Sequence, residues 1–495
     1  KSFNKERDRM LFNSFIFIFL FLPIVFSGYF LLNHFKKYQL SIYWLALGSL
    51  FFYGYFEPKY LILITISISI NYIIGSLMNR SEERGKKRIL LTIGILFNVS
   101  LLGYYKYADF FISNTNTVLG TNFNLLHLIL PLGLSFITFQ KIAYLVDTYR
   151  GETKDYKFST FVLFATFFPQ LIAGPIVHHK EVIPQFEEEK SKRISLDNVS
   201  KGIFIFLIGL TKKVFIADTV AIWANDGFQN YHNLTFLESW ITSFAYTTQL
   251  YFDFSGYCDM AIGLALLFNI KLPTNFHSPY KSRNIQDFWK RWHMTLGRFL
   301  TQYIYIPFGG NRKGPTRTYF NLFIVFFISG FWHGAGWTFI IWGTLHGIAS
   351  ILVRLWGKTK IQLPYWISWL LTFQFVNVAW IYFRAATVDQ ANIMITKMFT
   401  PNWAEFKEFL SHPVRHFPQS VTYKIGTLSL DNPKLIVLSL FILLLIAFLT
   451  KNSIQRLEEF KYKWFNIIAC QLMLILVLIS IFYMQKNSIF LYFNF

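Results

Sequence analysis

Apolar runs separated by short polar loops fill the chain from residue 11 to residue 483. Most of the runs approach the ~20 residues that a helix needs to cross a bilayer. They predict helices at residues 11–32, 42–56, 60–78, 89–111, 125–146, 158–177, 199–223, 239–254, 256–270, 366–383, 435–449 and 464–483. Lipid offers backbone groups no hydrogen-bond partner, so these segments are expected to be helical. The pattern therefore predicts an all-α, polytopic integral membrane protein with roughly ten to twelve transmembrane helices and some bent or re-entrant ones.

Two apolar stretches are expected to contain breaks. Residues 318–356 form a run about twice as long as one span requires, and Gly334 and Gly336 can interrupt it beside His333. Residues 167–175, with two prolines and a glycine, are the best candidate for a re-entrant segment. The break would place an imidazole deep in the protein, where ionisable groups usually face a bundle interior or a wet cavity.

The loops predict the topology and the domain boundaries. Basic loops at residues 80–88, 180–193, 281–317 and 451–463 are expected on the cytoplasmic side. Residues 384–433, which are poor in Lys and Arg, are expected to form an external loop. Residues 1–9 are interpreted as an extension before the natural start at Met10, and residues 10–495 as one integral-membrane domain.

Composition agrees with a membrane protein and excludes a soluble globule, since 54% of residues are hydrophobic and only 15% are charged. The net charge of +21 could indicate nucleic acid. However, the basic residues lie in loops between the apolar runs, where cytoplasmic topology and anionic lipid explain most of the charge. No nucleic-acid partner is expected. Part of the charge could hold a donor that carries phosphates.

The longest basic segment lies inside a central region, residues 251–346. Residues 281–317 contain eight Lys and Arg and the single acid Asp287. Two histidines in this region are candidates for chemistry, His293 and His333. Each has a structural alternative: His333 as a core histidine bonded to a backbone carbonyl, and His293 as an interfacial helix residue.

Several long motifs in this region resemble one family. They read Y-F-D-F-S-G-Y-C-D-M-A-I-G from residue 251, R-N-I-Q-D-F-W-K-R-W-H from residue 283, Y-I-P-F-G-G-N-R from residue 305 and F-W-H-G-A-G-W from residue 331. Further matches start at residues 135 and 168. Together they are similar to membrane-bound O-acyltransferases, and more narrowly to the bacterial branch that O-acetylates cell-envelope polysaccharides.

The resemblance implies a fold with a central tunnel and an acyl transfer across the bacterial cytoplasmic (inner) membrane. Acetyl-CoA would be the donor, bound from the cytoplasmic side with its phosphates near Arg291, Arg312 and Lys313. His333 would match the invariant histidine and act as general base. His293 would position or polarise the thioester, or help to move the proton. No metal and no further cofactor is expected, and His412 and His416 are poor metal ligands because Pro413 separates them without acidic companions.

The acceptor and the partner are less determined by the sequence. The resemblance implies an extracytoplasmic acetyltransferase as partner. The amino-acid usage, rich in Ile, Lys, Asn and Phe, suggests an AT-rich genome, which favours peptidoglycan over alginate or another exopolysaccharide as the acceptor. Tyr492, among three phenylalanines at the C-terminal end, is interpreted either as an interfacial anchor or as an acyl relay. The alternatives are D-alanyl transfer to teichoic acid, a proton-coupled transporter and an envelope scaffold.

Two acids in the central region must be paired, solvated or neutral, because they stand in an otherwise apolar segment. Asp253 and Asp259 are expected to anchor the basic segment 281–317 or to orient a histidine, with the anchoring role favoured.

Overall fold

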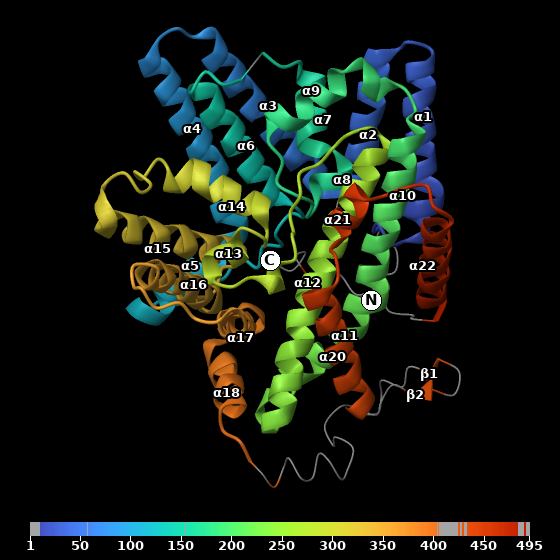
Figure 1. The fold of residues 1–495 in the computed structure, drawn as a ribbon. Helices are drawn as coiled ribbons and strands as arrows, with labels where there is room; N and C mark the ends of the chain where they lie inside the picture. Colours follow the sequence, from blue (N-terminus) through green and yellow to red (C-terminus); the bar gives the residue numbers. More distant parts are fainter. Residues whose placement is uncertain are drawn as a thin grey trace. The chain divides into compact units, whose positions relative to one another are not determined.

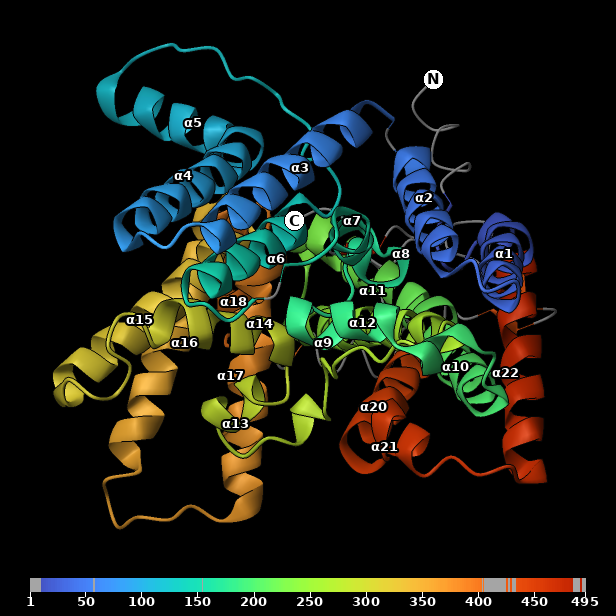
Figure 2. The same ribbon diagram turned by 90° about the horizontal axis from the view of Figure 1, so that it is seen from above.

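The chain folds almost entirely into helices (Figures 1 and 2). The computed structural model describes residues 10–56, 58–153, 155–402, 404, 424–425, 428–429, 433–483 and 490–491. The helices form two compact units, the first from Lys1–Phe206 and Cys258–Thr274, the second from Leu207–Tyr257 and Asn275–Phe495. Helices α10 (Leu196–Leu210) and α12 (Phe236–Leu267) contribute residues to both units.

The first unit contains the N-terminal helices. They are η1 (Ile16–Phe21), α1 (Leu22–His34), α2 (Tyr38–Phe56), α3 (Pro58–Arg80), α4 (Arg84–Leu102), η2 (Gly103–Tyr107), α5 (Ala108–Leu119), α6 (Leu134–Tyr149), α7 (Phe158–Thr166), α8 (Phe168–Leu171), α9 (His179–Glu187) and η3 (Glu189–Lys192). Helices α3, α4 and α6 pack side by side in both views.

The second unit contains the central motifs. Its helices before the break at residue 334 are η4 (Thr211–Ala217), α11 (Asp218–Gln229), η5 (Tyr231–Asn233), η6 (Pro279–Lys281), α13 (Ile285–Trp289), α14 (Met294–Leu300), η7 (Thr301–Tyr305) and α15 (Gly314–His333). Those after it are α16 (Trp337–Trp356), α17 (Tyr365–Arg384), α18 (Val388–Met398), α20 (Pro433–Leu449), α21 (Ser453–Glu458) and α22 (Trp464–Tyr483), and strands β1 (Lys424–Ile425) and β2 (Leu428–Ser429) form a short antiparallel pair.

The predicted class is confirmed: the protein is an all-helical, multi-pass membrane protein. Six helices among the described residues are long and apolar enough to cross a membrane, and the apolar helices at residues 435–449 and 464–478 are shorter. The six are Ile16–His34, Pro58–Arg80, Arg84–Leu119, Phe236–Leu267, Trp337–Trp356 and Tyr365–Arg384.

The predicted break beside His333 is confirmed. Helix α15 ends at His333, and α16 begins at Trp337 after an extended turn through Gly334 and Gly336. The two helices fold back on each other and pack side by side (Figure 2). Glycine permits this close approach, because a Cβ on Gly343 would lie 2.4 Å from the Phe326 carbonyl oxygen. The hairpin thus fixes His333 at its closed end.

The predicted break at residues 167–175 also occurs. Helix α7 ends at Thr166, α8 covers four residues, and non-helical backbone follows to Pro175. All nine residues are buried. Irregular backbone is tolerated at membrane depth where protein surrounds it.

Two helix predictions were wrong. The two spans predicted at residues 239–254 and 256–270 fall in one helix, α12, which ends at Leu267. Gly256 does not turn the chain there; its missing side chain makes room for the Gly209 carbonyl oxygen, 2.8 Å from where a Cβ would stand.

The other wrong prediction concerns residues 125–133, which are not helical. Helix α5 ends at Leu119, followed by Gly120 with φ +65°, and α6 begins at Leu134, after the turn at Gly133 with φ +70°. Between them the carboxylate of Asp109 accepts the N–H groups of Leu126 and His127, which holds the segment in an irregular path.

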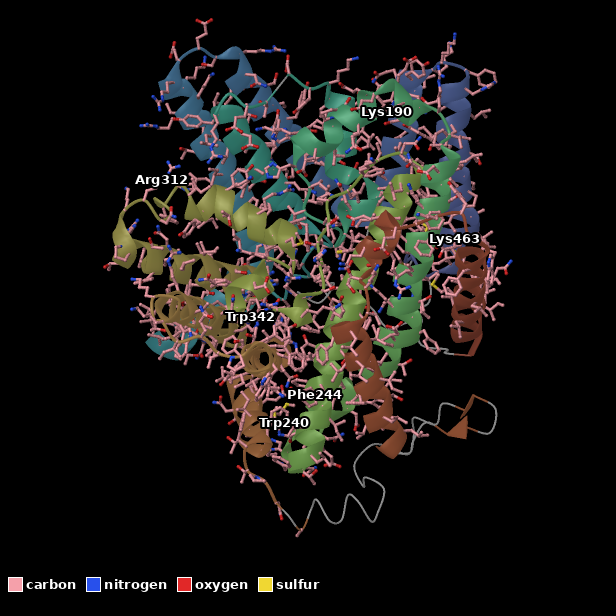
Figure 3. The ribbon with its side chains drawn as sticks, in the orientation of Figure 1. Lys190, Trp240, Phe244, Arg312, Trp342 and Lys463 are labelled. Atoms are coloured by element: carbon pink, nitrogen blue, oxygen red, sulfur yellow. The ribbon has the colours of Figure 1, made fainter. Side chains whose placement is uncertain are left out.

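The expected external loop 384–433 is described only in part. Its beginning forms α18, and the indole N–H of Trp240 donates to the Met398 carbonyl (2.8 Å). Trp240 is labelled in Figure 3. His412 and His416 lie outside the described residues.

Candidate active site

His293 stands at a strained point of the backbone. It is the N-cap of α14 and has φ +45° and ψ +51°, the left-handed region that costs a residue with a Cβ free energy. Its side chain is completely buried. Such strain persists only where the surrounding structure holds it, and it is frequent at functional sites.

Asn275 holds His293 in place. The side-chain oxygen of Asn275 accepts the backbone N–H (3.2 Å) and the hydroxyl (2.9 Å) of Thr295 and lies 3.1 Å from His293 Nδ1. The Asn275 carbonyl also accepts the Met294 N–H (3.0 Å). Because this oxygen is an acceptor, Nδ1 of His293 must carry the proton, which leaves the lone pair on Nε2.

Burial keeps His293 neutral. The residue lies outside the six candidate spans, and desolvation lowers its pKa from 6.5 to about 3. At neutral pH the ring is therefore uncharged, and its Nε2 can accept a hydrogen bond.

His333 joins His293 from a different motif. The two imidazole centroids are 6.4 Å apart, and His333 is almost fully buried. Trp342 and Phe383 lie against His333, each with its centroid 5.1 Å away, and Trp342 is labelled in Figure 3. The structure therefore brings together the two histidines that the sequence predicted, inside an aromatic wall.

A third histidine, which the sequence analysis left without a role, supports this wall. His346 of α16 is fully buried, and its Nδ1 accepts the indole N–H of Trp289 (3.2 Å). The ring also lies 4.9 Å from that of Trp342. His346 thus ties α13 to α16 and packs against the same tryptophan as His333.

The C-terminal end reaches the same region. The Leu491 N–H donates to Asp253 Oδ2 (2.9 Å), and the Phe490 ring stacks on Tyr257 at 4.5 Å. Phe490 also lies 5.8 Å from Phe254, whose ring is 4.9 Å from His293. Tyr492 follows directly in the sequence but lies outside the described residues.

Asp253 is an anchor, as predicted, but it holds a different segment from the one expected. Lys213 Nζ lies 2.9 Å from its carboxylate and donates to Asp218 (2.6 Å), and both Lys213 and Asp253 are buried. This ion pair and the bond to Leu491 connect α12 with η4 and the C-terminal end. Lys213 could not be located from sequence because it lies 40 residues away from Asp253.

The basic residues proposed for the donor lie in two places. Arg291 donates from Nε to Asp287 Oδ1 (2.8 Å) on the partly exposed side of α13. Arg312 and Lys313 are exposed in the loop before α15, where Figure 3 labels Arg312. His333 is at the other end of this 20-residue helix, which corresponds to about 30 Å.

More basic residues share the end of the hairpin where Arg312 stands. Helix α16 runs back along α15, so its C-terminal end returns to this point. Lys358 there lies over the Tyr319 ring at 5.4 Å, and Arg317 lies over Phe320 at 5.1 Å. The open end of the hairpin is thus cationic, and its closed end carries His333.

Comparisons with known proteins define the class. Residues 148–388 match the model of the MBOAT, membrane-bound O-acyltransferase family. A peptidoglycan O-acetyltransferase of Helicobacter pylori is 45% identical over 520 aligned positions, which cover 98% of both chains. A probable alginate O-acetylase of Pseudomonas putida is 40% identical and covers 79% of this chain and 80% of its own.

A teichoic acid D-alanyltransferase of Bacillus subtilis is more distant, with 28% identity over 50% of this chain and 67% of its own. The fold and these similarities define a multi-pass membrane acyltransferase. This chain belongs to the membrane-bound O-acyltransferase family, in the bacterial branch of polysaccharide O-acetyltransferases.

Asn275→Ala should lower kcat about 10- to 100-fold with a smaller change in KM, because a histidine that loses its orienting partner is misplaced by a fraction of an ångström or more. Acetyl transfer by the purified protein measures the effect. Thr295→Val is the matched control, since it removes another bond to the same Asn275 oxygen (2.9 Å) but leaves that of His293. Equal losses in both variants would reduce Asn275 to a structural role.

Proposed function

We propose that this protein transfers acetyl groups from cytoplasmic acetyl-CoA across the bacterial cytoplasmic membrane for O-acetylation of peptidoglycan. The pair of buried imidazoles at His293 and His333 carries the proposal. The acceptor is inferred from the 98% coverage of the Helicobacter pylori relative, compared with 79% for the alginate relative. An exopolysaccharide such as alginate is the next candidate.

The geometry suits one substrate oxygen held between two rings. An oxygen hydrogen-bonded to an imidazole nitrogen lies about 4 Å from the ring centre. Rings 6.4 Å apart can therefore share one oxygen. His333 removes the proton of the attacking hydroxyl as the hydroxyl oxygen forms its bond to the acetyl carbon, and the coenzyme A thiolate leaves.

The orientation of His293 narrows its role. The family resemblance leaves three roles open for this histidine: positioning the thioester, polarising it, or moving the proton. Neutral His293 has its proton on Nδ1, which faces Asn275, so Nε2 presents a lone pair and cannot donate to a thioester oxygen. Accepting a hydrogen bond, and so positioning the group that donates it, is the role that fits.

The C-terminal end offers a route for the acetyl group. Phe490 and Leu491 are buried. The Phe490 ring packs against Phe254, which lies next to His293, and the Leu491 N–H donates to Asp253. A tyrosine that follows Leu491 can take the acetyl group as a phenyl ester, which stays activated enough to pass it on. An extracytoplasmic acetyltransferase would then receive the group and deliver it to the polysaccharide.

D-alanyl transfer from a carrier-protein thioester is the second candidate in this family. It is less well supported, because the D-alanyltransferase of Bacillus subtilis aligns with only 50% of this chain. Labelled acetyl-CoA and a D-alanyl carrier protein, supplied separately to the purified enzyme, distinguish the two donors.

His333→Ala should lower acetyl transfer at least about 100-fold, because a positioned general base contributes that much or more. His293→Ala should also lose most activity. Base-released acetate from the envelope of a complemented deletion strain measures transfer, and detergent gel filtration confirms folding. His277→Ala is the control, since it removes a partly exposed imidazole from the Asn275 loop. Activity near wild type in a folded His333→Ala protein would exclude this histidine as the base.

Replacing Arg312 and Lys313 with Gln should raise the KM for acetyl-CoA more than it lowers kcat, if the phosphates of the donor bind at the open end of the hairpin. Contacts so far from the reacting carbon contribute mainly uniform binding. A double Lys37→Gln, Lys86→Gln variant removes the same charge elsewhere. If KM stays unchanged, the phosphates bind at another place.

Tyr492→Phe should abolish polysaccharide acetylation and leave expression intact, because only the hydroxyl that accepts the acetyl group is lost. Mass analysis of envelope sugars provides the measurement. Tyr43→Phe, at an exposed position of α2, controls for the loss of a tyrosine hydroxyl. Normal acetylation would make Tyr492 an anchor and require the acceptor hydroxyl to reach His333 directly.

A further inference from the structure

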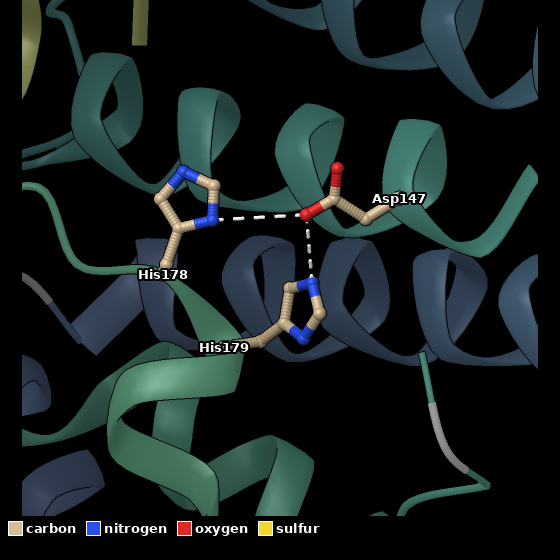
Figure 4. A group of neighbouring side chains, drawn as sticks. All are labelled: Asp147, His178 and His179. Atoms are coloured by element: carbon tan, nitrogen blue, oxygen red, sulfur yellow. Dashed lines mark hydrogen bonds and ion pairs between the residues drawn. The ribbon is translucent and has the colours of Figure 1, made fainter. Parts of the chain in front are cut away.

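A cluster of three metal-ligating side chains lies in the first unit, outside the histidine pair. Asp147 stands in the last turn of α6, and His178 and His179 stand at the start of α9. Both imidazoles are directed at the same carboxylate (Figure 4). One ligand atom from each side chain can be chosen so that all three lie within 4.8 Å of one another.

The distances within the cluster suit a tetrahedral ion. Ligand atoms about 2.1 Å from a tetrahedral metal are about 3.4 Å apart. Asp147 Oδ2 is 3.0 Å from His179 Nε2 and 3.6 Å from His178 Nδ1, one distance just below this value and one just above it. A small movement of either ring would place three ligands around one point and leave a fourth position for water.

A neighbouring hydroxyl group can orient His179 in the way that metal-ligating histidines are usually oriented. Tyr156 Oη lies 2.9 Å from His179 Nδ1, the nitrogen that does not face Asp147. If Nδ1 donates its proton to this hydroxyl, Nε2 presents its lone pair, as a metal ligand must. Asp147 and His179 are buried, whereas His178 is partly exposed and leaves a path for an ion.

A second reading needs no ion. His179 Nε2 can donate to Asp147, and Arg150 Nη1 lies 3.7 Å from the other oxygen of this carboxylate. That arrangement uses His179 and leaves His178 Nδ1 3.6 Å from the carboxylate, beyond hydrogen-bonding distance. A shared ion uses both rings, because nitrogens of both face the same carboxylate oxygen.

We infer that Asp147, His178 and His179 bind one divalent transition-metal ion, Zn²⁺ by preference, that pins the start of α9 to the end of α6. Two imidazoles and a carboxylate with an open position are a common zinc set. Binding uses the lone pair of His179 Nε2, so the proton that this nitrogen shares with Asp147 in the metal-free protein is carried instead on Nδ1, facing Tyr156, and the ring stays neutral. Acyl transfer at His333 needs no metal, and the inferred ion has a structural role independent of the proposed function.

Metal content of the tag-free full-length protein in detergent tests the inference. After treatment with a chelator and dialysis against ZnCl₂, elemental analysis should find one Zn²⁺ per chain. Asp147→Asn and His178→Gln should each weaken Zn²⁺ binding at least about tenfold, and Tyr156→Phe, which removes only the orienting hydroxyl, about tenfold. His34→Gln, at an exposed histidine of the same unit, should bind as wild type does.

Co²⁺ provides an independent measurement, because a tetrahedral site gives an intense visible absorption that should disappear in His178→Gln. This variant loses the most exposed of the three ligands and is expected to fold even if Asp147→Asn does not. Less than about a tenth of an ion per chain, or equal binding by wild type and His178→Gln, would overturn the inference. Tighter binding of Ni²⁺ than of Zn²⁺ would keep the site and overturn the preference for zinc.

Discussion

Polar groups buried in an apolar protein must find their partners within the protein, and this constraint explains most of the specific contacts described here. Lys213 is buried between Asp218 and Asp253. Asn71 and Asn98 exchange side-chain hydrogen bonds between α3 and α4. Each such contact permits only one packing of its helices, since any other arrangement would leave a charge or an amide unpaired. The polar pairs thereby set the register in which the apolar helices meet.

The same constraint produces the chemistry of the site. Asn275 satisfies two donors of Thr295 and orients His293, so one side chain both completes the start of α14 and selects the tautomer of a histidine. Burial, which makes these bonds necessary, also keeps His293 uncharged. A neutral imidazole with a directed lone pair is therefore a consequence of the packing around it, and needs no nearby acid.

Close contacts between α15 and α16 position His333, the second histidine of the site. Glycines at 330 and 343 allow α15 and α16 to touch backbone to backbone, which fixes the turn at residues 334–336 and with it the position of His333. The aromatic rings of Trp342 and Phe383 then leave His333 little freedom. The pairing of His333 with His293 therefore depends on two sets of contacts: the glycine contact between α15 and α16, and the hydrogen bonds of Asn275.

The sequence by itself determined the class of the protein, because apolar length, loop charge and long family motifs are local properties. It also predicted the break at Gly334 and singled out two histidines that the structure brings together, since each stands within one short motif. Only the tertiary structure decided that α12 is continuous, because Gly256 permits a turn and a close helix contact equally well, and only the neighbouring Gly209 shows which occurs. Likewise, Asn275 becomes the partner of His293, Lys213 that of Asp253, and Asp147 that of His178 and His179 only through folding. Residues 18, 40 and about 30 positions apart meet because of helix packing, which no local pattern records.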